Sequence, residues 1–230
     1  MSLDKIKLKL IYTSRRNTIC YTAIDHDTLS IKAPHGLSMD YIQQDIKRNR
    51  NRLQQLFDSY NLDSPSFDYS DGSKLLLMGD DFTLHYIDTE EYIWFLNVDM
   101  HILCVSKAHQ SQIVEVLKDF YSSQAEYLRS RCRTLASEHG IKVNRIALRW
   151  THSKWGSCST LGNVNLCKFL ILAPTAIQDY IILHELCHLI HMNHSSEFYA
   201  LLGKMDPDYK LHRHWLKDRG KSLRIFPQNS

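Results

Sequence analysis

At 230 residues the chain is long enough for one large domain or two small ones, and 43% apolar content is ordinary for a protein with a core. The formal net charge of +3 is too small to imply binding to nucleic acid or to a membrane surface. Six cysteines are scattered without a C-x-x-C pair, which argues against a disulfide framework or a zinc ribbon. We therefore expect reduced thiols in a cytoplasm.

The N-terminus alternates lysine with apolar residues as far as Leu10 and never builds the continuous apolar core of a signal peptide. The longest apolar run, around residues 169–173, is far shorter than the ~20 residues that cross a membrane. We expect a soluble protein without a membrane partner, and the sequence does not indicate its oligomeric state.

Short strands dominate the first part of the chain, which we take as a β-rich region over residues 1–108. Alternating apolar residues and tight turns predict a small meander first and further strands later. One helix is expected between them, capped by Ser38 and running to about Phe57. A loop follows at 61–73. The expected strands are 6–10, 18–24, 29–32, 75–78, 82–86 and 92–105, the last broken around 97–100.

A basic run, Lys47 to Arg52, lies mainly outside the apolar stripe of that helix. Such a run can hold a phosphate backbone, so nucleic-acid binding stays open. A solvated helix face is the favoured interpretation, because no aromatic residues alternate with the charges as they do in nucleic-acid platforms.

The second part, residues 109–230, is expected to contain mainly helices, in contrast to the short strands of the first part. A long helix over 109–139, ended by Gly140, is expected to link the two parts. Beyond it a strand at 146–150, the turn-rich segment 151–162 and a strand at 163–169 precede three helices. These helices are expected to begin after Pro174, near Ser195 and at Tyr209, and together the elements predict an α+β fold.

The stretch His184-Glu-Leu-Cys-His188 has the pattern H-E-x-x-H inside an apolar helical segment. On a helix the two histidines are separated by about 40° of rotation and roughly 6 Å of rise, so both imidazoles project from one side. Glu185 lies on the flank of that stripe, about 100° from His184, where it reaches a metal-bound water more easily than the metal. We predict a catalytic zinc site with Glu185 as general base.

A catalytic zinc site uses three protein ligands and keeps a fourth position for water. The third ligand has to come back over the metal, so the helix must end after His188, with Asn193 suited to a left-handed turn. This favours His194. Three rivals stay open, because a following helix can also complete such a site: Glu197, Asp206 and His212.

With these residues placed, the C-terminal stretch resembles the YgjP-like family of metal-dependent hydrolases, which are zincin-like metallopeptidases related to the SprT type. The resemblance covers residues 145–220 and implies a zincin-like domain with zinc on His184, His188 and His194 and with Glu185 as base. Cys167 departs from the family, which more often has Asn there, so substrate preference is open. The matching motifs are Lys154-Trp-Gly-Ser-Cys-Ser159, Asn163 to Pro174, Asp179-Tyr180, His184-Glu-Leu-Cys-His188, Asn193-His-Ser195 with Phe198, and Trp215-Leu216.

We expect a hydrolase in which Glu185 takes a proton from a zinc-bound water that attacks a carbonyl, with a peptide bond as the first candidate substrate. The strand at 163–168 is expected to pair with an extended peptide. Candidates for the oxyanion donor are Tyr209, His212 and Arg149.

Two alternatives remain. The same centre is compatible with hydrolysis of a nucleoside triphosphate, whose phosphates Lys154, Arg149 and Arg213 would hold. The other alternative is a nucleic-acid or protein binding module in which the metal is structural, but a base beside the histidines argues against it.

Overall fold

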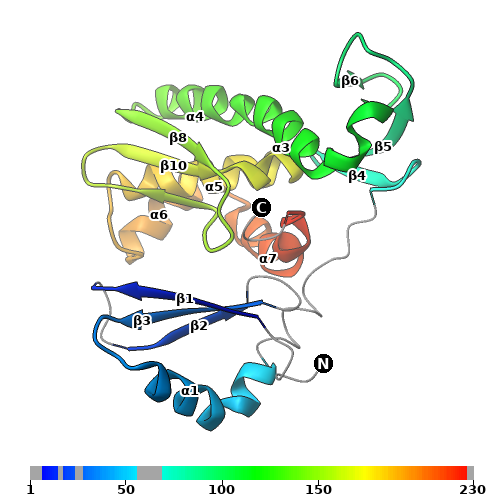
Figure 1. Ribbon diagram of the computed structural model, residues 1–230. Coiled ribbons are helices and arrows are strands. Elements are labelled where there is room, and N and C mark those ends of the chain that lie inside the picture. The colour runs from blue at the N-terminus through cyan, green and yellow to red at the C-terminus, as the bar shows by residue number, and fades with distance from the viewer. Residues whose placement is uncertain (1–6, 15–17, 24–27, 56–68, 227–230) are drawn as a thin grey trace. The chain divides into compact units, whose positions relative to one another are not determined.

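The computed structural model describes residues 7–14, 18–23, 28–55 and 69–226 and confirms the α+β class (Figure 1). Contacts divide the chain into two compact units, one of residues 1–66 with 226–230 and one of residues 67–225. Among the described residues, no helix combines the length and apolar character needed to cross a membrane.

The smaller unit contains a three-stranded sheet whose order is β1-β3-β2. The predicted meander is wrong, because β1 and β3 run parallel to each other and β2 joins β3 from the other side. β3 is central because its side chains are the most buried, with Leu29 and Ile31 each 1% exposed. The strands are β1 (Lys7–Thr13), β2 (Cys20–Ala23) and β3 (Thr28–Pro34).

Helix α1 (Met39–Arg48) begins at Ser38, whose side chain accepts a hydrogen bond from the Tyr41 amide as the sequence predicted. Its buried residue Ile42 joins the core formed by β3, while Lys47 and Arg48 occupy the last turn. Residues 50–55 are helical again, and the predicted end at Phe57 lies outside the described residues. The apolar stripe therefore faces the sheet, and the basic residues from 47 to 52 are exposed.

The larger unit starts with a four-stranded sheet in the order β4-β5-β7-β6. The turn between β4 and β5 is fixed by backbone hydrogen bonds from Met78 and Gly79 to Ile171 and Leu172, the residues just before the metal-motif helix. The expected boundary at 108/109 therefore falls inside this unit. The strands are β4 (Lys74–Leu77), β5 (Asp80–Ile87), β6 (Trp94–Asn97) and β7 (Ile102–Ser106).

The expected single helix over 109–139 is instead three consecutive pieces, so that prediction is wrong in detail. They are the 3-10 helix η2 (Lys107–Gln112), α3 (Ile113–Gln124) and α4 (Glu126–Glu138). Ala125 separates the two α-helices but keeps a right-handed helical backbone, so the chain bends there without reversing. Gly140, with φ of 65°, ends the segment as predicted.

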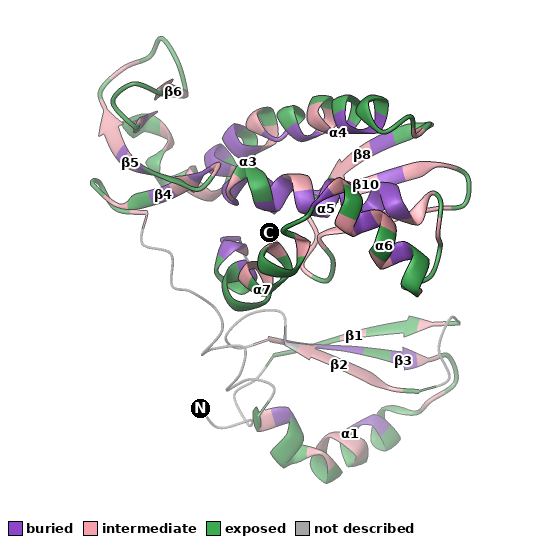
Figure 2. Ribbon diagram, turned by 180° about the vertical axis from the view of Figure 1, so that it is seen from behind, coloured by how far each residue is buried: buried purple, intermediate pink, exposed green. Residues whose placement is uncertain are grey.

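A second sheet in the order β8-β10-β9 packs with α4 and α5, and α5 is buried along most of its length (Figure 2). The chain then continues through two more helices and a short 3-10 turn. The elements are β8 (Arg145–Arg149), β9 (Gly156–Cys158), β10 (Asn163–Cys167), η3 (Lys168–Leu172), α5 (Thr175–His188), α6 (Ser196–Met205), α7 (Tyr209–Arg219) and η4 (Gly220–Leu223).

Candidate metal centre

Helix α5 carries the histidine pair and ends where the sequence predicted, at His188. The end is made by tight backbone bonds, from Leu189 to Leu186 and from Ile190 to Cys187, each 3.0 Å. The prediction of a left-handed Asn193 is wrong, since Met78 and His101 are the non-glycine residues with positive φ in the described part of the chain. The 3-10-like end turns the chain without that conformation.

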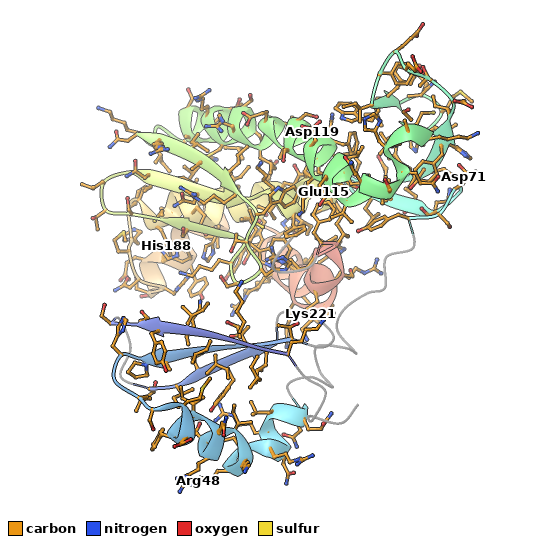
Figure 3. All side chains as sticks on the ribbon, in the orientation of Figure 1. Arg48, Asp71, Glu115, Asp119, His188 and Lys221 are labelled. Atoms are coloured by element: carbon orange, nitrogen blue, oxygen red, sulfur yellow. The ribbon has the colours of Figure 1, made fainter. Side chains whose placement is uncertain are left out.

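The structure brings His184, His188 and His194 together, with one potential ligand atom from each within 4.8 Å of the others. The Nε2 atoms of His184 and His194 lie 3.1 Å apart. The Phe198 ring packs against all three imidazoles, with centroid distances of 4.6 to 5.0 Å. Figure 3 labels His188 in this region. Ser195 caps α6 by accepting a hydrogen bond from the Phe198 amide, which fixes both Phe198 and the adjacent His194.

None of the three rival ligands belongs to this cluster. Asp206 and His212 instead pair with each other, with Oδ2 and Nδ1 2.8 Å apart. Glu197 is exposed in the first turn of α6, where hydrogen bonding by Ser195 lowers the pKa of its carboxyl. The donor set is therefore three imidazoles, which suits zinc.

The surroundings of His184 and His188 favour their neutral imidazoles, the form that binds a metal. Burial, together with the neighbouring His188 and His194, lowers the pKa of His184 to about 4. Burial also lowers the pKa of His188, whose Nδ1 lies 3.2 Å from the carbonyl oxygen of His191. That contact fits a hydrogen bond from Nδ1 and leaves Nε2 for a ligand bond.

Glu185 is 5% exposed, and burial raises the pKa of its carboxyl to about 7, against a smaller opposite effect of Lys154. Its carboxylate lies directly against Gly156 of β9. A Cβ atom at Gly156 would be 2.5 Å from Oε1 of Glu185, so a larger residue at 156 would displace the carboxylate. Sequence reasoning quoted Gly156 in a motif but gave it no role, because its partner lies in a distant helix.

The other motif residues hold α5 in place. Asp179 accepts two hydrogen bonds from Arg131 of α4, at 2.8 and 2.7 Å. The Tyr180 ring packs near the rings of both His184 and His212, with centroids 6.1 and 6.2 Å away. Cys187 is fully buried and packs against Met205, so it is part of the core and not of the histidine cluster.

The candidates for the oxyanion donor are spread around this centre. Tyr209 stacks on Tyr199, which stacks on His194, each pair with centroids 6.0 Å apart. Arg149 is exposed at the end of β8. His212 is paired with Asp206, and its ring packs near Tyr180. Tyr180 in turn packs near His184.

The predicted pairing of a peptide with the strand at 163–168 is wrong, because β10 is the central strand of its sheet. β8 pairs with one side of β10 and β9 with the other. Within the described residues, β9 is hydrogen-bonded on one side alone, and it is the strand that contacts α5 beside Glu185.

Comparison with known proteins decides the family. The profile of the YgjP-like metallopeptidase domain matches residues 19–219. The chain belongs to the YgjP-like metallopeptidase family. It is therefore a metal-dependent hydrolase, and its family implies the metal that the three histidines are suited to hold.

Other comparisons add little to this YgjP-like assignment. The crystal structure of the metallopeptidase zymogen of Pyrococcus abyssi abylysin is similar to part of the chain, at 23% identity and a TM-score of 0.33. The match covers 40% of this chain and 93% of that one. No curated protein matches significantly.

Proposed function

We propose that this YgjP-like protein is a zinc-dependent peptidase in which His184, His188 and His194 hold one zinc ion and Glu185 is the general base. The observation that carries the proposal is the cluster itself: three imidazole nitrogens lie within 4.8 Å of one another, and two of them come from the helix that carries a buried carboxyl. Three ligands leave a fourth position open, as catalysis requires.

Bound by these three histidines, zinc would supply a Lewis acid that lowers the pKa of water and polarises a carbonyl oxygen. Glu185 accepts the proton of the attacking water and returns it to the leaving amine. Burial raises the pKa of this carboxyl in the metal-free protein, and a raised pKa favours its taking up a proton. Gly156 leaves the space in which the carboxylate lies.

One edge of β9 has no partner strand among the described residues, and this edge supports an extended peptide as substrate. A peptide adding to that edge would place its backbone beside Gly156, and thus next to Glu185. All six cysteines are free thiols, which supports the cytoplasm as the compartment in which this substrate is met.

The two alternative functions place different demands on this centre. A nucleotide hydrolase would use the same centre with Lys154, Arg149 and Arg213 on phosphates. A purely structural site closes with four protein ligands, whereas the described residues supply a cluster of three. The open position and the buried base both favour an enzyme.

The test combines metal content with a substrate screen. Wild type and Glu185→Gln are purified, their bound zinc is measured, and both are assayed on casein, mixed peptides and nucleoside triphosphates. We expect equal zinc, cleavage of peptide bonds by wild type, and loss of at least about 100-fold in the variant. Full activity in Glu185→Gln would contradict the base, and cleavage of triphosphates alone would favour the nucleotide alternative.

A further inference from the structure

The C-terminal tail that follows α7 reaches back to the loop that precedes β9. Leu223 and Ile225 are buried, and the Ile225 carbonyl accepts a hydrogen bond of 2.7 Å from the Tyr69 hydroxyl. The tail is thereby fixed on both sides of Arg224. Lys221, labelled in Figure 3, marks its start.

The guanidinium of Arg224 makes several contacts with the loop at residues 150–155 and its surroundings. It donates to the carbonyl of Thr151 and, at 3.4 Å, to that of Lys154. It also lies 2.8 Å from the sulfur of Cys167, whose thiol donates to the same Thr151 carbonyl at 3.2 Å. A single cation therefore binds both ends of this loop and the strand behind it.

The same guanidinium stacks on Trp155, with Cζ 3.6 Å from the ring centroid. Gly220 meets the same indole: a Cβ there would be 3.0 Å from Cζ2 of Trp155. The backbone of Trp155 is held as well, because its carbonyl accepts a hydrogen bond of 2.8 Å from the Cys167 amide. Trp155 is thus fixed by the tail, by the end of α7 and by β10.

Trp155 immediately precedes Gly156, whose missing side chain leaves the space for the Glu185 carboxylate. A displacement of Trp155 moves Gly156 toward or away from that carboxylate. We propose that Arg224 is a positioning residue, which holds Trp155 and Gly156 in the register that keeps Glu185 in its reactive position. The loop part of this inference rests on contacts alone, and the catalytic part rests on the proposed function.

Cys167 of β10 also takes part in this arrangement. Its small side chain is fully buried, and it contacts both the Arg224 guanidinium and the Thr151 carbonyl. The loop is therefore fastened to β10 by a side chain as well as by the backbone, and Arg224 is the group that joins the two.

Hydrogen–deuterium exchange of the segment 151–158 tests the loop part without any substrate. The variants are Arg224→Ala, Arg224→Lys, which keeps the charge and the packing of the tail, and Arg219→Ala as a matched control from the exposed last turn of α7. We expect exchange about tenfold faster in Arg224→Ala, an intermediate rate in Arg224→Lys, and the wild-type rate in Arg219→Ala.

Zinc content and peptide hydrolysis by the same variants test the catalytic part. We expect a kcat lower by about 10- to 100-fold in Arg224→Ala, with zinc content and KM unchanged and partial recovery in Arg224→Lys. Wild-type exchange of 151–158 in both Arg224 variants would overturn the proposal. The proposal would also be overturned if Arg224→Ala exchanged faster but kept the wild-type kcat while Glu185→Gln was inactive. If Glu185→Gln keeps full activity, the assignment of Glu185 as base fails. The role of Arg224 in holding the loop is then still decided by the exchange of 151–158.

Discussion

Replacing Glu185 by Gln is expected to stabilise the metal-free protein at alkaline pH while it removes activity. Glu185 is 5% exposed, and burial raises the pKa of its carboxyl from 4.5 to about 7. The folded state therefore binds this proton more tightly than the unfolded state does, so stability falls as pH rises through the window from 4.5 to 7.

The size of the effect follows from the pKa difference. The shift is 7 − 4.5 = 2.5, and at about 1.36 kcal/mol per pKa unit the ionised carboxylate costs about 3 kcal/mol of folding free energy above pH 7. At pH 5 most of this cost is absent, and about 1 kcal/mol remains by the same relation. Gln carries no charge at either pH, so the variant avoids the cost.

The measurement is urea unfolding of both proteins in chelator at pH 5 and pH 8. We expect the difference in unfolding free energy, variant minus wild type, to grow by about 2 kcal/mol in favour of Glu185→Gln between the two. A difference independent of pH would refute the reasoning, because it would mean that the carboxyl has an ordinary pKa. Zinc is expected to reduce the variant's advantage, because a nearby cation favours the carboxylate.

Three further predictions follow from the site. His194→Ala should lower zinc affinity at least about 10-fold by equilibrium dialysis, while the control Glu197→Ala keeps it; equal loss in both would contradict the ligand assignment. Gly156→Ala should lower kcat about 100-fold with zinc retained, because the new methyl group displaces the Glu185 carboxylate; wild-type kcat would show that the carboxylate tolerates it. Asp179→Asn should lower the unfolding free energy by about 1–3 kcal/mol in urea titrations, because it weakens the bidentate pair with Arg131; an unchanged midpoint would assign that pair no role in stability.

The histidine pair and the position of Glu185 beside it were predictable from the sequence because their geometry is local. Helical periodicity alone fixes the relation of His184 to His188 and of Glu185 to both. The helix end before His194 also followed, since a third imidazole has to return over the first two. The details of that end did not follow, because either a 3-10 turn or a left-handed residue can turn the chain after a helix, and the structure uses the 3-10 turn.

Strand order was not predictable, because it depends on partners distant in sequence. The strands before α1 alternate as a meander would, yet β3 takes the centre because it has the most apolar surface to bury. The same applies to β10, which the sequence offered as a substrate edge and which lies between two neighbours. The edge strand next to Glu185 is β9 instead, and a strand of three residues is too short for periodicity to detect.

Two glycines show what sequence reasoning lacks here. Glycine is usually explained by a turn with positive φ, as at Gly140, but neither Gly156 nor Gly220 has one. Each is small because a side chain from far along the chain occupies the space: Glu185 at one, Trp155 at the other. Trp155 is adjacent to Gly156, so the two close contacts form one path from the end of α7 to the base. The position of the carboxylate thus depends on the C-terminal tail as well as on the helix that carries it.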